Sequence, residues 1–259
     1  MGGLKSRQLS TITILMISNL FGTSILGIIV LVRGVGFPNH SVIAWALLAG
    51  LAGITALLML YRAMAIGSIS IIAPISATGV ILPVVFGIGN GDPVSNLQFA
   101  GIIAAICGTI LTAREKSKEH EKKRMAKGVH LAIGAAINIG LYFVLMDKAS
   151  DVDPYWAAFM MRSSYIFFLI PVVLIRRPAL KVQLEHYPAI ISMGVSDALA
   201  AFSFAIATKI GLLSIVSVIG ALYPVVTIGL ALVVLKERPQ KIQSFGIGLA
   251  IIGVALIST

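Results

Sequence analysis

The chain lacks several features that soluble proteins and secreted scaffolds depend on. Only one of its 259 residues is a cysteine, Cys107, so no disulfide bond can form within the chain. Charged residues make up 12% of the sequence, whereas soluble domains contain about a quarter. Hydrophobic residues reach 58%, which is more than water-soluble folds bury. The composition therefore predicts an integral membrane protein.

Motifs for catalysis are also missing. The sequence has no Gly-x-Ser-x-Gly elbow and no phosphate-binding loop. Its four histidines, His40, His120, His130 and His186, are not spaced for shared metal binding. We therefore expect no enzyme activity, no cofactor and no metal. We also expect no nucleic-acid partner, because the net charge of +10 is explained by basic residues at the cytoplasmic side of a membrane protein.

Hydrophobic runs divide the chain into nine predicted transmembrane helices, since about 20 apolar residues cross the hydrocarbon layer. The predicted spans are Leu9–Val32, Val42–Ile66, Ser68–Ile88, Leu97–Thr112, Val129–Met146, Tyr155–Ile175, Ala189–Ala207, Leu212–Leu235 and Ile242–Ile257. The predicted fold class is thus an all-α integral membrane protein.

The sequence repeats itself. Four positions match at an offset of 145 residues: Gln98, Gly101, Ala105 and Gly108 correspond to Gln243, Gly246, Ala250 and Gly253. Pro83 corresponds to Pro224 at an offset of 141. We therefore predict a first repeat of four helices in residues 1–113, a basic linker in 114–127 and a second repeat of five helices in 128–259.

The basic residues predict the orientation of these repeats. Fifteen of the 20 lysines and arginines fall on one side of the nine spans, and three, Arg33, Lys148 and Lys209, fall on the other. This asymmetry places the N-terminus and the linker in the cytoplasm and the C-terminus outside. The first span of the first repeat then enters the membrane from the cytoplasm, whereas its counterpart in the second repeat enters from outside. An inverted repeat of this kind is typical of secondary transporters.

Several segments together resemble a known family. They are Tyr61-Arg62-Ala63-Met64, Gly67, Pro83 and Gln98–Gly108 in the first half, and Ala207, Gly211, Tyr223-Pro224, Lys236-Glu237-Arg238 and Gln243–Gly253 in the second. On these motifs, the chain resembles the EamA-type group of the drug/metabolite transporter superfamily over nearly its whole length. The first half departs from the pattern at Gly91-Asp92-Pro93, which lacks the basic member of the corresponding motif. The resemblance implies ten helices, so we expect that the first family helix is missing and that the repeats are unequal, four and five.

Charged and polar residues inside the spans are the candidate functional residues. Ionisable groups at membrane depth are costly and generally face the protein interior or water. The candidates for a substrate pathway are Asp197, Arg162, Asn138, Tyr142, Ser164, Tyr223, Pro83 and Pro224. For Asp197 a hydrogen-bonded structural role is the alternative, and for Arg162 snorkelling to the interface. For the two prolines the alternative is a structural kink. Arg162 is the expected counter-charge of Asp197.

The predicted function is secondary transport, by efflux or uptake, of a small organic metabolite or drug across the cytoplasmic membrane by alternating access. The alternative is a non-transporting membrane subunit that packs against a partner protein. We expect a multi-pass protein of the cell membrane whose partners are the lipid bilayer and a small-molecule substrate. A homodimer is left open, as are the substrate, the direction and the coupling ion.

Overall fold

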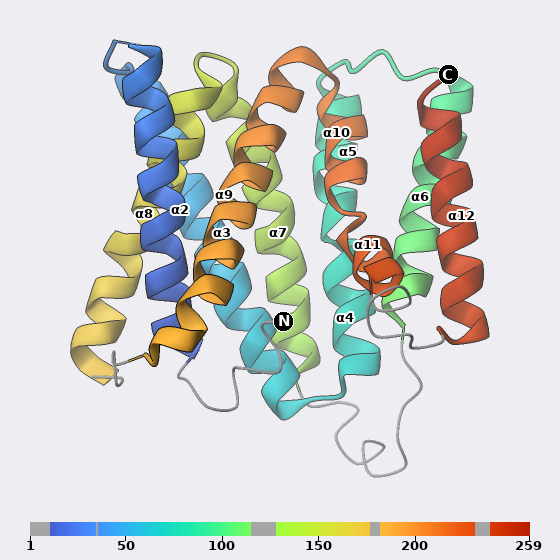
Figure 1. Ribbon diagram of the computed structural model, residues 1–259. Helices are drawn as coiled ribbons and strands as arrows, with labels where there is room; N and C mark the ends of the chain where they lie inside the picture. The colour runs from blue at the N-terminus through green and yellow to red at the C-terminus, as the bar shows by residue number, and fades with distance from the viewer. Residues whose placement is uncertain (1–10, 35, 115–127, 177–181, 231–238) are drawn as a thin grey trace. The chain divides into compact units, whose positions relative to one another are not determined.

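The computed structural model describes residues 11–34, 36–114, 128–176, 182–230 and 239–259, and these residues form helices and no strands (Figure 1). Its elements are α2 (Thr11–Arg33), α3 (His40–Ile66), α4 (Ile69–Ala77), η1 (Thr78–Val80), α5 (Ile81–Gly89), α6 (Asn96–Ala113), α7 (Val129–Ser150), α8 (Pro154–Arg176), η3 (Leu184–His186), α9 (Tyr187–Ile210), α10 (Leu213–Gly220), α11 (Tyr223–Leu230) and α12 (Lys241–Ile257).

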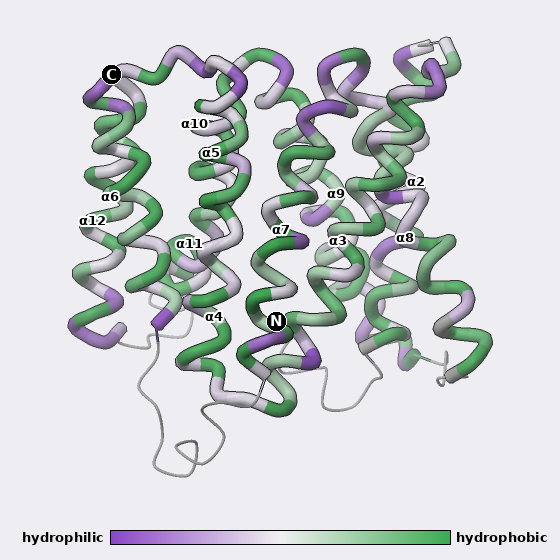
Figure 2. Tube along the Cα trace, turned by 180° about the vertical axis from the view of Figure 1, so that it is seen from behind, coloured by the Kyte–Doolittle hydropathy of each residue, from purple (hydrophilic) through white to green (hydrophobic). Residues whose placement is uncertain are grey.

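Within the described residues, eight segments are long and apolar enough to cross a membrane, and α12 is a shorter apolar helix. Hydrophobic residues line most of each helix, and hydrophilic residues gather toward the helix ends (Figure 2). This distribution is required in lipid, because each backbone polar group inside the hydrocarbon must be paired within its helix. The predicted class, an all-α multi-pass membrane protein, is confirmed.

One predicted boundary was wrong by a full turn. The fifth span was expected to end at Met146, but α7 continues to Ser150. The extension carries Asp147, which is only 9% exposed, and Lys148, which pairs with Asp151 at 3.9 Å three residues further on. Because these charges have partners close by, they remain in the last turns of the helix instead of ending it.

The chain forms two compact units that do not coincide with its two sequence halves. Unit 1 comprises Met1–Ile54 and Leu145–Ile210, and unit 2 comprises Thr55–Val144 and Gly211–Thr259. Each unit therefore combines helices from both halves.

In unit 2, repeat-related residues meet each other. The position that a Cβ of Gly101 would take lies 2.7 Å from the Gly253 carbonyl oxygen, and that of Gly246 lies 2.7 Å from the Gly108 carbonyl oxygen. The start of α6 thus contacts the end of α12, and the start of α12 contacts the end of α6, so the two helices are antiparallel. Glycine at these positions allows backbones to approach closely, which is how helices associate in a membrane. The inverted relation predicted from the charges is present in this pair.

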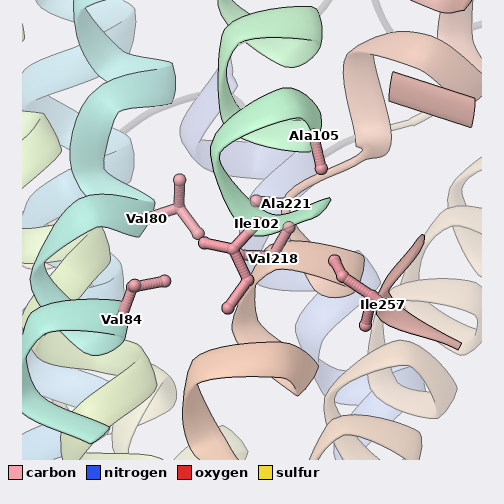
Figure 3. Close-up of a cluster of buried hydrophobic side chains, with 7 residues drawn as sticks. All are labelled: Val80, Val84, Ile102, Ala105, Val218, Ala221 and Ile257. Carbon is pink, nitrogen blue, oxygen red and sulfur yellow. The ribbon is translucent and has the colours of Figure 1, made fainter. Parts of the chain in front are cut away.

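The core of unit 2 is built where two spans are interrupted. The third span is divided into α4, η1 and α5, and the eighth into α10 and α11. Val80 of η1 and Ala221, which follows α10, have the same 141-residue offset as the two prolines. Both belong to one buried cluster, drawn in Figure 3, with Val84, Ile102, Ala105, Val218 and Ile257. Interrupted helices of this kind surround the substrate sites of many transporters.

A loop carboxylate stabilises the start of α10. The Ser214 amide donates a hydrogen bond to Asp92 Oδ2 at 2.9 Å, and Gly91 turns the preceding loop with φ of +99°. An acidic group at a helix N-terminus pairs with amide groups that have no partner within the helix. The Asp92 position of the first-half motif therefore has a capping role, whereas Lys236-Glu237-Arg238 lies outside the described residues.

Candidate functional site

An ion pair lies deep in unit 1, between α8 and α9. Nη1 of Arg162 donates a hydrogen bond to Oδ2 of Asp197 at 2.6 Å. The two side chains differ sharply in exposure, at 4% for Arg162 and 67% for Asp197. The expected pairing of these residues is confirmed, and the Arg162 guanidinium is directed to Asp197 within the protein. The cation is enclosed by the protein, while its carboxylate partner remains accessible.

Helix α2 packs against this ion pair together with α8 and α9. Asn19 Nδ2 donates to the backbone carbonyl of Arg162 at 3.1 Å. A Cβ on Gly22 would lie 3.1 Å from Arg162 Nη2 and 2.5 Å from the Gly194 carbonyl oxygen. The guanidinium carbon also lies 5.4 Å from the ring centre of Tyr165. Because Gly22 has no side chain, α2 can approach α8 and α9 closely enough to enclose the guanidinium.

Three buried polar atoms around the ion pair have no hydrogen-bond partner in the described part of the chain. They are Oδ1 of Asn19, Oγ1 of Thr23 and Nε of Arg162. Their side chains are 3%, 9% and 4% exposed. Buried polar groups are nearly always paired, and the usual missing partner is ordered water or a polar ligand group. The sequence analysis did not identify Asn19 or Thr23. Their four-residue spacing on one face of α2 was visible, but nothing in the sequence indicated which helix that face contacts.

Ser164, another predicted pathway residue, lies two residues after Arg162, on the opposite side of α8, where it contacts α3. Its side chain is 1% exposed and its hydroxyl donates to the Met161 carbonyl at 2.6 Å. A Cβ on Gly50 would overlap this hydroxyl. These contacts favour a packing role for Ser164.

The two predicted prolines occupy equivalent places in unit 2. Pro83 is the third residue of α5 and Pro224 the second residue of α11, so each lies in the first turn after an interruption. A proline has no amide proton, and the first turn of a helix is where this is tolerated. Because Pro83 has no amide proton, it cannot donate a hydrogen bond to the Gly79 carbonyl. That carbonyl oxygen lies against α7, where a Cβ on Gly140 would be only 2.6 Å from it. Each proline thus lies at the start of a helical segment, Pro83 after the 3₁₀ turn η1 and Pro224 after the turn at residues 221–222.

The remaining predicted residues also lie in unit 2, on α7 and α11. Asn138 Nδ2 donates to the Gly134 carbonyl at 2.9 Å and lies 3.9 Å from Met59 Sδ. Tyr142 is partly buried, with its ring centre 5.4 Å from that of Phe143. Tyr223 is 52% exposed and lines a cavity of about 200 Å³ together with Pro224. The predicted residues thus fall into two groups, one around the ion pair of unit 1 and one in unit 2.

No group of three or more His, Cys, Asp and Glu side chains within the described ranges could hold a metal ion. The charged chemistry of the two groups is limited to Arg162 and Asp197. What this arrangement can do is bind a proton, a cation or a hydrogen-bonding group at Asp197, and order water or a polar group beside Arg162.

The comparisons with known proteins agree with this architecture. The model of the EamA-like transporter family matches residues 1–114 and 126–259. Comparison with curated proteins finds none with significant similarity. Among solved structures, one described only as the crystal structure of a protein aligns with a TM-score of 0.80 at 16% identity. That alignment covers 99% of this chain and 92% of the solved chain, and at this identity it shows the fold alone. The family consists of membrane transporters of small molecules, and because its model matches nearly the whole sequence, this chain is a member of the EamA-like transporter family.

Proposed function

We propose that this protein is a secondary transporter that moves a small organic metabolite or drug across the cell membrane, by efflux or uptake, through alternating access. We further propose that Asp197 couples this movement to protons. The observation that carries the proposal is the exposed carboxylate of Asp197 in the middle of a membrane-spanning helix, paired with a buried arginine.

The depth of Asp197 limits what its exposed side can face. Asp197 lies ten residues after the start of α9 at Tyr187, which corresponds to about 15 Å along the helix at 1.5 Å per residue. The hydrocarbon layer is about 30 Å thick, so this position is close to its middle. A charged side chain at that depth costs at least about 2.5–3.5 kcal/mol against lipid. The exposed face of Asp197 therefore fits a water-filled path or another polar surface better than lipid.

Three serines of α9 also lie on the exposed side of this helix. Ser192, Ser196 and Ser203 are exposed, and a rotation of about 100° per residue places them within one narrow sector of the helix. Asp197 lies about 100–140° around the helix from these serines, at the edge of the exposed face where its carboxylate reaches Arg162, and the exposed Met193 and Ala200 lie between them. A polar stripe along a spanning helix is the pattern expected for the wall of a solute pathway.

The predicted alternative, a non-transporting membrane subunit, uses the same stripe differently. A partner protein with polar groups at the same depth would cover Ser192, Ser196 and Asp197 and satisfy their hydrogen bonds. Such a protein would purify with a stoichiometric partner and give no solute flux. A homodimer could supply that partner surface, so the mass of the purified particle is part of the test.

The experiment uses proteoliposomes loaded with the pH-sensitive dye pyranine and exposed in turn to a panel of small metabolites and drugs. We expect at least one solute to move protons with the wild type, and Asp197→Asn to abolish gradient-driven accumulation while counterflow exchange continues. The matched control is Asp151→Asn, which removes a carboxylate from the loop after α7. Unchanged gradient dependence in Asp197→Asn would remove this residue from the coupling mechanism, and a wild type without flux but with a co-purified partner would favour the subunit.

A further inference from the structure

One turn of α2 places a second polar surface beside the guanidinium of Arg162. A Cβ on Gly22 would lie 3.1 Å from Arg162 Nη2, so this turn lies directly against the guanidinium. The same turn carries Asn19 and Thr23, three residues before and one residue after Gly22. We call these two side chains the α2 acceptors, because Oδ1 of Asn19 and Oγ1 of Thr23 can each accept a hydrogen bond.

Both α2 acceptors lie on the side of α2 that packs against α8. Asn19 Nδ2 donates to the Arg162 carbonyl at 3.1 Å, and a Cβ on Gly27 would lie 3.1 Å from the Phe159 ring. A rotation of about 100° per residue places Thr23 between Asn19 and Gly27 around the helix. Thr23 is also buried, so its hydroxyl is enclosed at the contact with α8.

The oxygen atoms of the α2 acceptors make no hydrogen bond within the part of the chain that the structure describes. Because Nδ2 of Asn19 donates to α8, the orientation of its amide is fixed and Oδ1 is left without a donor. The Thr23 hydroxyl differs from those of Ser18 and Ser24, which donate to carbonyls three and four residues earlier in α2. Nε of Arg162 lacks an acceptor as well. The contact between α2 and α8 thus holds two unused acceptors and an unused guanidinium donor.

We propose that the α2 acceptors hold the Arg162 guanidinium when Asp197 is neutral, and that they are therefore positioning residues for proton coupling. In the structure the guanidinium donates to the Asp197 carboxylate at 2.6 Å. A proton on Asp197 removes the anion, and a guanidinium that is 4% exposed cannot turn to water instead. The protonated group keeps one carbonyl oxygen as an acceptor, whereas α2 offers two acceptors that no donor occupies. Rotation of the guanidinium toward α2 releases the carboxyl group while the positive charge stays inside the protein.

Few other groups around the guanidinium can titrate. The ring centre of Tyr165 on α8 lies 5.4 Å from the guanidinium carbon, and the ionisable group that contacts it from α9 is Asp197. Helix α2 has no ionisable residue before Arg33 at its end, and α3 meets α8 on the opposite side, at Ser164. Asp197 is thus the group whose protonation changes the charge balance at Arg162. The inference rests on the proposed function only in taking proton uptake at Asp197 as a step of the transport cycle.

The test compares the cost of losing the Thr23 hydroxyl before and after Asp197 is neutralised. Asp197→Asn keeps one carbonyl oxygen and removes the charge, as protonation does, and Thr23→Val replaces the hydroxyl by a methyl group of similar size. Unfolding of the full chain is measured in mixed micelles by tryptophan fluorescence. With Asp197 present, we expect Thr23→Val to change the unfolding equilibrium constant by less than about threefold, because an unpartnered hydroxyl contributes little. In the Asp197→Asn background we expect an increase of about tenfold or more, as for the loss of a hydrogen bond to a charged group.

Two control variants separate re-pairing of Arg162 from general packing. Thr23→Ser keeps a hydroxyl, so its effect should be the same in both backgrounds. Thr208→Val removes a buried hydroxyl of α9 that donates to the Ala205 carbonyl at 3.3 Å, eleven residues beyond Asp197, and its effect should also be equal in both. If the Thr23→Val and Asp197→Asn double variant fails to fold, while Thr208→Val with Asp197→Asn folds, the cost is non-additive in the expected direction.

Equal costs of Thr23→Val in the two backgrounds would overturn the inference. So would a large cost with Asp197 present, because the hydroxyl would then already have a partner such as a buried water, and so would a Thr23→Ser variant that behaves as Thr23→Val does. The readout needs no flux, which separates this inference from the proposed function. Unequal costs in a protein that moves no solute would refute only the transporter, and equal costs in a proton-coupled transporter would refute only the α2 acceptors.

Discussion

Removing Asp197 should destabilise unit 1 more than removing its partner, because the two side chains are buried so unequally. In Asp197→Ala the guanidinium of Arg162, 4% exposed, stays in the interior without its anion. Breaking a buried ion pair in this way typically costs about 3–5 kcal/mol. In Arg162→Met the cation is replaced by an apolar side chain of similar length, and the remaining carboxylate is 67% exposed. The loss is then closer to that of an exposed ion pair, below about 1 kcal/mol.

The expected difference between the two variants is therefore about 2–5 kcal/mol, and the double variant should resemble Arg162→Met. Unfolding in mixed micelles can be followed by tryptophan fluorescence, because both tryptophans, Trp45 and Trp156, lie in unit 1. Asp151→Ala, which breaks the exposed 3.9 Å pair with Lys148, serves as the control with little effect. Equal costs for the two single variants, or a double variant less stable than Asp197→Ala, would refute the reasoning.

Two further predictions concern packing and topology. Gly108→Ala should lower the free energy of unfolding by about 1–3 kcal/mol, since its Cβ would clash with the Ala250 and Gly246 backbone. The control is Gly248→Ala on α12, whose Cβ would meet no atom within 4 Å and which should be neutral or stabilising by up to about 1 kcal/mol. Equal shifts in melting temperature for Gly108→Ala and Gly248→Ala would contradict the α6–α12 contact. In a Cys107→Ala background, cysteine at position 259 should react with an impermeant maleimide in intact cells and cysteine at position 122 should not, and the reverse pattern would invert the topology.

The positions of the helices could be predicted from the sequence because lipid imposes a simple rule. Long apolar runs ended by charge or proline mark spans, and most predicted boundaries fall within a few residues of the observed ones. The exception at Met146 shows where the rule is weak, because charges paired within a helix end do not terminate it. Similarly, the prolines of these spans were visible, but not that one follows a 3₁₀ turn and the other a two-residue turn.

The environment of the ion pair could be predicted only in part. Arg162 and Asp197 were identified because a charge inside a span is rare. The burial of Arg162 was not predictable, since it depends on Gly22 and Gly194, which bring α2 close to α8 and α9. Glycines are common in membrane helices, and the sequence alone does not distinguish those that form a crossing from those, such as Gly248, that face open space. The unpartnered Asn19 and Thr23 atoms were missed for the same reason.

The location of Asp197 also has an electrical consequence. With its carboxylate ionised, the pair with Arg162 is neutral overall, and a proton bound at Asp197 would leave a net charge of one unit near the middle of the membrane. A full crossing of the membrane by one charge is worth about 2.3 kcal/mol per 100 mV, so a proton that reaches half depth senses roughly half of that. At 100 mV this energy is about 1.15 kcal/mol, which corresponds to about a sevenfold change in an equilibrium that moves one charge to this depth. Membrane voltage and pH would therefore both act at this one carboxylate. The voltage effect would scale with the fraction of the electric field that lies between Asp197 and the side from which the proton enters.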